Sequence, residues 1–222
     1  MSLAIAGCLK LYPLFFGVFL LKNKKWFASF RVAVYFFAIF FSSFFLLKTD
    51  LANLFEFTEN LGGFMSNETR LLGYNNLSIS ALIFKVLHIF IPSLSSSSTL
   101  FSVISITALV IVFISGTIAA VKTKNDLTRL VICACMVILI PSISYFYVIV
   151  FTVLPFLEYV KSCESIPRKR SMLYFLSFLF LYITPWAITR FFLLHSLLLI
   201  SLLVYEIVRV FKNELFKKNI LA

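Results

Sequence analysis

The sequence has 222 residues, of which 61% are hydrophobic and only 13% are charged, and its mean hydropathy is +1.02. So few polar side chains cannot cover the surface of a soluble domain of this length, which excludes a soluble globular protein. The formal net charge is +11. Its cations stand in short clusters at the ends of apolar runs, as membrane topology requires, so we expect membrane lipid and no nucleic acid as a partner.

Long apolar runs predict an all-α fold, a polytopic membrane helix bundle that forms one domain over residues 1–222. A spanning helix needs about 20 apolar residues, and backbone groups in lipid must be satisfied within the segment. Seven segments approach this length. In chain order they are Ser2–Leu21, Phe27–Leu47, Thr99–Ala120, Leu127–Ile140, Ile143–Val160, Met172–Pro185 and Ala187–Val208.

Basic residues between the spans predict the orientation of the chain. Cytoplasmic loops carry an excess of Lys and Arg, and the four basic clusters share the cytoplasmic face only if Leu77–Leu94 does not cross the membrane. This segment carries Lys85 and His88. We therefore predict that it is an amphipathic or re-entrant helix on the outer face, within an extracytoplasmic loop of residues 48–98. The basic clusters are Lys22–Arg31, Lys122–Arg129, Lys161–Arg170 and Arg209–Lys218.

A polar run in this loop predicts the start of a helix. Asn75, Asn76 and Ser78 are of the types that cap the amino-terminal end of a helix. That end presents free N–H groups and partial positive charge, which favour a phosphate. Lys85 lies about two turns further on, and Arg70 precedes the helix. Two interpretations stay open: a lipid-phosphate site at the outer interface, or a capped surface helix whose lysine reaches lipid headgroups.

Two further cations are candidate ligands on the outer side. Lys10 lies within an apolar run, where a cation either faces a cavity, a partner or an anion, or snorkels to the interface. Arg190 follows a Pro-Trp turn that also falls on the outer face. An interface anchor is the commoner explanation for such a residue.

The remaining polar and sulfur side chains predict no catalytic centre and no metal site. Glu158 and Glu206 stand near basic residues at cytoplasmic span ends, where interfacial ion pairs explain them. His195 is alone on a Leu-rich helix, where a packed histidine is commoner than a ligand. The four cysteines lack metal-ligand spacing and fit buried small hydrophobes. Neither a nucleophile motif nor a nucleotide-binding motif is present, so we predict no cofactor and the catalytic residues stay unknown.

Four short motifs follow one another in a suggestive order: the Lys-Leu-Tyr-Pro run at Lys10–Pro13, the tetrad Asn75–Ser78, Lys85, and the turn Pro141–Tyr145. In this order the chain resembles, over about residues 1–160, the carboxy-terminal half of the family 87 membrane glycosyltransferases. These are mannosyltransferase-like enzymes of the GT-C class. Tyr145 stands where tryptophan is usual in that family.

The resemblance implies hexosyl or mannosyl transfer from a polyprenyl-phosphate sugar donor to a glycan or glycolipid acceptor, at the extracytoplasmic face. It also implies that Arg70, Lys85, Lys10 and Arg190 hold the lipid phosphate, and that a carboxylate takes the acceptor proton. The outer loop in which the family carries this base has no counterpart here and would precede Met1. We therefore expect that this chain is an incomplete or inactive half of such an enzyme, or a half that a second chain completes. We also expect a multi-pass protein of a bacterial inner membrane.

The acidic residues of the extracytoplasmic loop do not identify a base by themselves. Asp50, Glu56, Glu59 and Glu68 all lie on the predicted outer side, and nothing in the sequence singles one out. The alternatives are non-enzymatic: a transporter, a lipid-handling protein, or an assembly subunit in which the 28 phenylalanines serve helix packing.

Overall fold

The computed structural model describes residues 16–17, 20, 25–46, 59–60, 68–73, 76–183 and 192–220. In these residues the regular structure is helical, with one isolated β-bridge between Asn76 and Tyr145. The prediction of an all-α fold is therefore confirmed. The chain divides into two compact units, Met1–Asn67 and Glu68–Ala222.

The first unit contains α3, which covers Trp26–Leu46 and coincides with a predicted span to within one residue. Aromatic rings four residues apart stack along it: the centroids of Phe36 and Phe40 lie 5.9 Å apart, and those of Phe37 and Phe41 lie 6.2 Å apart. Phe27 is 83% exposed. A helix with such rings on its surface suits an apolar environment better than water.

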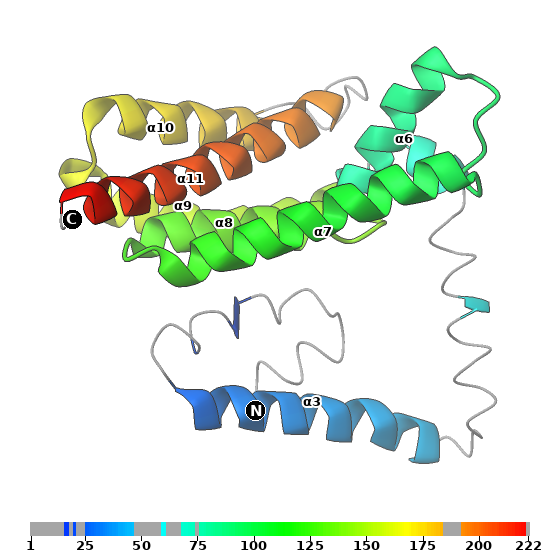
Figure 1. Ribbon diagram of the computed structural model, residues 1–222, viewed down its shortest axis with the longest axis horizontal. Helices are drawn as coiled ribbons and strands as arrows, with labels where there is room; N and C mark the ends of the chain where they lie inside the picture. Colours follow the sequence, from blue (N-terminus) through cyan, green and yellow to red (C-terminus); the bar gives the residue numbers. More distant parts are fainter. Residues whose placement is uncertain are drawn as a thin grey trace. The chain divides into compact units, whose positions relative to one another are not determined.

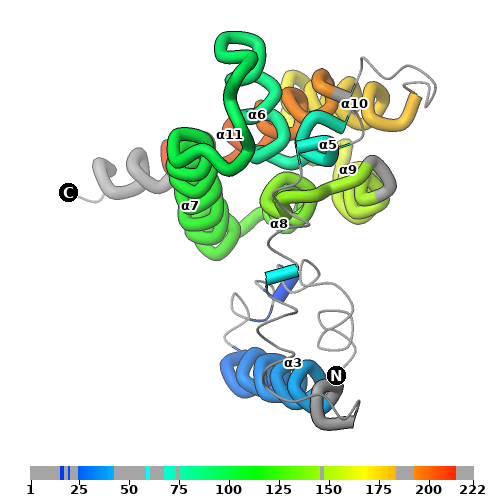
Figure 2. The backbone as a smooth tube through the Cα atoms, turned by 90° about the vertical axis from the view of Figure 1, so that its right-hand side faces the viewer, coloured from blue at the N-terminus to red at the C-terminus, as the bar shows by residue number. Residues whose placement is uncertain are grey.

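The second unit is a bundle of antiparallel helices (Figure 1). Viewed along the bundle, α7, α8 and α9 form one row, and α10 and α11 lie to one side of that row (Figure 2). Its helices are α7 (Thr99–Lys122), α8 (Asp126–Leu139), α9 (Val153–Ser162), α10 (Arg168–Ile183) and α11 (Phe192–Ile220).

Helix α8 is the centre of this unit. It packs against α7, α9 and α11, and of its residues from Leu127 to Leu139 only Leu130 is not buried. Cys133 and Cys135 are among them, as expected for small hydrophobes. A helix that is apolar on all sides belongs in the middle of a bundle, because no face of it gains from water.

Side-chain caps set where three of the helices begin. The Ser78 hydroxyl accepts the Ala81 N–H at 3.1 Å, at the start of α6 (Ile79–Phe90). The Ser98 hydroxyl accepts the Phe101 N–H at 3.3 Å, and the Asn125 side chain accepts the Thr128 N–H at 2.8 Å. These are the residue types that satisfy the free N–H groups of a first turn, so local chemistry fixes these boundaries.

The segment Ile143–Val160, predicted as one span, contains two kinds of helix, and its crossing of the membrane stays a prediction. A 3-10 helix, η2 (Phe146–Thr152), precedes α9. Pro155 lies in the first turn of α9, where its missing N–H does no harm, but a longer α-helix would bring its ring against the carbonyl group of residue 151. The proline therefore explains why the α-helix begins where it does.

By length and composition, two of the described helices are long and apolar enough to cross a membrane: Thr99–Lys122 and Leu193–Asn213. Two shorter apolar helices cover Trp26–Ser42 and Ile79–Phe90. The count of seven spans stays a prediction.

The two ends of the second unit differ in chemistry. At one end, α6 stands beside the start of α7 (Figure 1), together with the turn Pro141–Tyr145. We call this the polar end. At the opposite end lie Lys122–Arg129, the start of α10 and the last part of α11, which we call the basic end. The assignment of these ends to the outer and cytoplasmic faces stays a prediction.

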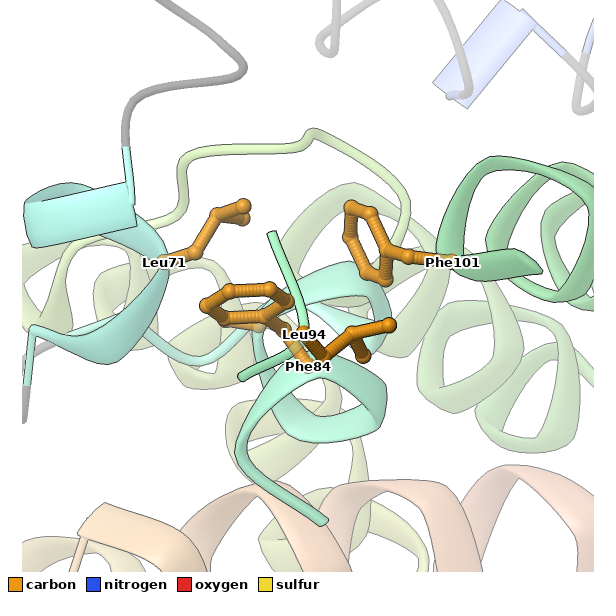
Figure 3. Close-up of a cluster of buried hydrophobic side chains, with 5 residues drawn as sticks. Leu71, Phe84, Leu94 and Phe101 are labelled. Carbon is orange, nitrogen blue, oxygen red and sulfur yellow. The ribbon is translucent and has the colours of Figure 1, made fainter. Parts of the chain in front are cut away.

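A small apolar core fixes α6 at the polar end. Phe84 meets Phe101 edge to face, with ring centroids 5.0 Å apart. Leu71 of α5 (Glu68–Leu72) and Leu94 close the cluster around Phe84 (Figure 3). A buried hydrogen bond of 2.8 Å between the hydroxyl groups of Ser80 and Ser105 adds a polar link between α6 and α7. Helix α6 is therefore held on two sides.

The close approach of α7 to α8 at Gly116 predicts a packing defect on substitution. A Cβ atom at Gly116 would lie 2.6 Å from Sδ of Met136. We expect Gly116→Ala to lower the free energy of unfolding by about 1 kcal/mol, because the overpacking against the Met136 side chain is partly offset by the better helix propensity of Ala. Unfolding of the purified chain measures this. In a Met136→Ala background the same substitution should cost less, and an equal cost in both backgrounds would contradict the contact.

Candidate functional site

The side-chain amide of Asn76 joins two segments that are far apart in the sequence. Its Nδ2 donates to the carbonyl oxygen of Arg70 at 3.2 Å and to that of Ser142 at 3.1 Å. Its Oδ1 accepts the N–H of Ser78 at 3.1 Å and that of Ser144 at 3.0 Å. Asn76 is 1% exposed; the two bonds to its Oδ1 are buried, and the two bonds from its Nδ2 are partly buried.

The turn Pro141–Tyr145 is bonded to the same region through its backbone. The Leu77 N–H donates to the Ser144 carbonyl at 2.7 Å, and the Ser78 hydroxyl donates to the Ser142 carbonyl at 2.9 Å while it caps α6. Pro141 follows Ile140, the C-cap residue of α8, and cannot continue the hydrogen-bonding pattern of the helix. The chain therefore turns at this proline, and its carbonyl groups face the Asn76 segment.

Lys85 places a half-buried amine next to this junction. Its Nζ donates to the Asn76 carbonyl oxygen at 3.3 Å, and within the described part of the chain no carboxylate pairs with it. Burial lowers the pKa of Lys85 from 10.5 to about 8, so the amine stays largely protonated at neutral pH. An ammonium group has three N–H donors, which leaves two of them for an anion.

The amino-terminal end of α6 is closed by the chain itself. Residues Leu77–Ala81 are at most 5% exposed, because α5, α7 and the turn Pro141–Tyr145 surround them. A phosphate therefore has no open path to the first N–H groups of this helix. In this geometry the contact that remains for an anion is the Lys85 amine, about two turns along the helix.

Arg70 and Glu68 belong to α5, beside α6. The side chain of Arg70 is half-buried, and its carbonyl group is held by Asn76. The carboxylate of Glu68 accepts the Ser96 N–H at 2.8 Å, which lowers its pKa. A carboxylate with a lowered pKa is a weak proton acceptor, so Glu68 is better suited to anchoring the Ser95–Ser98 segment than to acting as a general base.

The structure thus brings together four of the predicted site residues, Arg70, Asn76, Ser78 and Lys85, although Asn76 and Ser78 spend their side chains on bonds within the protein. The other three lie outside the described residues, as do two of the candidate bases. These are Lys10, Asn75 and Arg190, with Asp50 and Glu56.

Sequence reasoning did not link Ser142 and Ser144 to the asparagine tetrad. The Ser144 hydroxyl is buried and has no hydrogen-bond partner among the described residues. In the sequence, Pro141 with serines at 142 and 144 predicts a turn. It does not predict which segment this turn contacts. The packed state predicted for His195 is confirmed, since its ring is 1% exposed and lies 5.1 Å from that of Phe180.

A half-buried cation beside apolar helices of a membrane protein marks a candidate functional site. The family model for glycosyltransferase family 87 matches residues 1–142, and the chain belongs to this family, whose members are membrane glycosyltransferases. The match confirms the resemblance seen in the motifs, and it includes Asn76, Lys85 and the start of the turn at Pro141. Neither curated proteins nor solved structures give a match to the chain.

The four bonds of Asn76 predict a large effect of its removal. Asn76→Ala would leave two buried N–H groups and two partly buried carbonyl groups without this partner, although the Ser142 carbonyl keeps the Ser78 hydroxyl. The expected cost is on the order of 3 kcal/mol. Asn125→Ala, the same exchange at the cap of α8, should cost only about 1 kcal/mol. Denaturant unfolding of both variants tests this, and equal costs would show that the Asn76 bonds contribute little.

The low pKa of Lys85 predicts how stability changes with pH. Between pH 8 and 10.5 the unfolded chain still binds a proton that the folded chain has released, so the native chain gains stability as pH rises through this window. We expect Lys85→Met to be more stable than the native chain. This difference in stability should be largest at pH 7 and should shrink toward pH 10.5. Thermal unfolding measures this, and Lys169→Met, at an exposed lysine, should show no such trend.

Proposed function

We propose that this chain takes part in hexosyl transfer, of the mannosyl type, from a polyprenyl-phosphate sugar to a glycan or glycolipid acceptor. The proposal includes a GT-C architecture and action at the extracytoplasmic face of a bacterial inner membrane. Membership of glycosyltransferase family 87 is the observation that carries it. The alternative of a transporter or assembly subunit gains no specific support from the described residues.

The proposed chemistry needs positive charge at the leaving group. When the sugar is transferred, the lipid phosphate gains negative charge, and fixed cations lower the energy of that change. Lys85 supports this role because its amine has an accepting carbonyl on one side and no carboxylate partner in the described chain. We propose that Arg70 assists, and that Lys10 and Arg190 contribute from the segments outside the described residues.

Asn76 and Ser78 have a positioning role in this proposal. The carbonyl of Asn76 accepts from the Lys85 amine, and the side chains of both residues hold that carbonyl against the turn Pro141–Tyr145. A lysine has a flexible stem, so a fixed acceptor limits where its charge lies. Asn75 is proposed to act with them as part of the same tetrad.

The general base is proposed to come from outside the described part of the second unit. Glu68 is engaged by the Ser96 N–H and has a lowered pKa, which makes it a poor acceptor for a hydroxyl proton. The carboxylate then comes from the other acidic residues of the predicted outer loop or from a second chain, and such a chain is the proposed partner besides the sugar donor and the acceptor.

A transfer assay tests the proposal. Membranes containing the chain, with and without a co-expressed chain from the upstream coding region, are supplied with a radiolabelled polyprenyl-phosphate sugar. We expect Lys85→Ala to reduce transfer about a hundredfold or more, since one oxyanion donor typically contributes this much. Lys85→Arg should retain part of the activity, because it keeps the charge.

Lys169→Ala is the matched control, because it removes the same charge at an exposed position of the basic end. It should leave transfer unchanged. Absence of transfer both alone and with the upstream chain would overturn the proposed function. Equal losses in Lys85→Ala and Lys169→Ala would instead reject the role given to Lys85.

A further inference from the structure

At the basic end, two arginines converge on one hydroxyl and one carboxylate. Arg170 of α10 donates from Nη2 to the Thr128 hydroxyl at 2.6 Å, and Arg209 of α11 donates to the same oxygen. Glu206 pairs with Arg209 at 2.6 Å and lies 3.7 Å from Nη2 of Arg170. The Tyr174 hydroxyl donates to the other oxygen of Glu206 at 2.6 Å. We call these five residues the arginine cluster.

The arginine cluster carries an excess of one positive charge. Its two guanidinium groups share a single carboxylate, which gives two positive charges against one negative charge. The neighbouring Arg129 does not change this balance, because it pairs with its own carboxylate, that of Asp126. Two guanidinium groups that meet at one oxygen repel each other, and an added anion would relieve this repulsion.

The accessible positive charge of the arginine cluster is that of Arg209, whose side chain is 23% exposed, whereas the Glu206 side chain is fully buried. Arg170 is buried, and its Nε and Nη2 donate to the Tyr174 hydroxyl at 3.1 and 2.7 Å. A ligand that approaches from outside therefore meets the Arg209 side chain first, with the charge of Arg170 behind it. Guanidinium groups bind phosphate through paired, directional hydrogen bonds, and they form stronger contacts with it than neutral donors do.

Apolar side chains flank the same arginines. Met172 and Leu173 follow Arg170 and are 62% and 36% exposed, and Val208, next to Arg209, is 57% exposed. A soluble anion cannot form apolar contacts with these side chains. A phospholipid can bind the arginine cluster through its phosphate and contact the apolar side chains through its acyl chains. The arginine cluster also lies near the start of α10 and in the last part of α11, and in the predicted membrane orientation such helix ends lie where headgroups meet the hydrocarbon.

We propose that the arginine cluster at the basic end is a binding site for the phosphate headgroup of an anionic phospholipid, with Arg209 as its ligand and the buried charge of Arg170 adding to the attraction. The site is separate from the one proposed for sugar transfer, which is at the polar end. Most of its residues follow position 142, where the family match ends. It would tie α8, α10 and α11 together through a lipid.

The test compares the thermal unfolding midpoint of the full chain in vesicles of phosphatidylcholine and in vesicles that also contain phosphatidylglycerol. Phosphatidylglycerol should raise the midpoint of the native chain, and inorganic phosphate added to phosphatidylcholine vesicles should not. Arg209→Gln should abolish the rise. Glu206→Gln should lower the midpoint in phosphatidylcholine but enlarge the rise with phosphatidylglycerol, because it removes the competing carboxylate.

Two controls separate a site from general attraction and from a structural role. Lys169→Gln removes an exposed charge next to Arg170 and should preserve the rise. Asn76→Ala weakens the polar end, away from the arginine cluster, and should lower the midpoint without changing the rise. An equal loss in Lys169→Gln and Arg209→Gln would overturn the proposal, and so would a rise that persists in Arg209→Gln. If Arg209→Gln does not fold, native mass spectrometry of the native chain decides: retained phosphatidylglycerol supports the site, and its absence rejects it.

Discussion

The arrangement of the polar end depends on the hydrogen-bonding capacity of one amide. Asn76 has two donors and two acceptor positions, and the structure uses them for the carbonyl groups of Arg70 and Ser142 and the N–H groups of Ser78 and Ser144. Buried backbone groups without partners are costly, so this side chain allows two irregular segments to meet inside an apolar bundle. Ser78 then begins α6, and α6 carries Lys85 to the junction.

The charged side chains of the second unit lie at its two ends. The energetic cost of burying a charge is reduced in a different way at each end. At the polar end, Lys85 has only a carbonyl partner among the described residues, so its burial lowers its pKa. At the basic end, Glu206 is surrounded by two guanidinium groups and a phenol, so a fully buried carboxylate is compensated. An undercompensated cation is free to bind an anion, whereas a paired carboxylate serves mainly to hold helices together.

Much of the helical organisation could be predicted from the sequence, because it follows from local rules. The boundaries of α3, α7 and α8 fall within two residues of the predicted ones, since apolar length and residues such as Asn125 act within a few positions. The division before α9 was missed, although Pro155 gives its physical reason. The nearness of Asn76, Ser78 and Lys85 could be predicted because they stand close together along the chain at the start of one helix, whereas their role as a binding site stays a prediction.

The sequence by itself determined the membrane character, the family, the helical class and the stretch that holds Asn76, Ser78 and Lys85, since each depends on composition, short motifs or local capping. Only the tertiary structure decided that Ser142 and Ser144 meet Asn76, that the start of α6 is closed, and that Thr128, Arg170 and Glu206 converge. These contacts join residues that are tens of positions apart. No local preference encodes such a pairing, because it results from how the helices pack around α8.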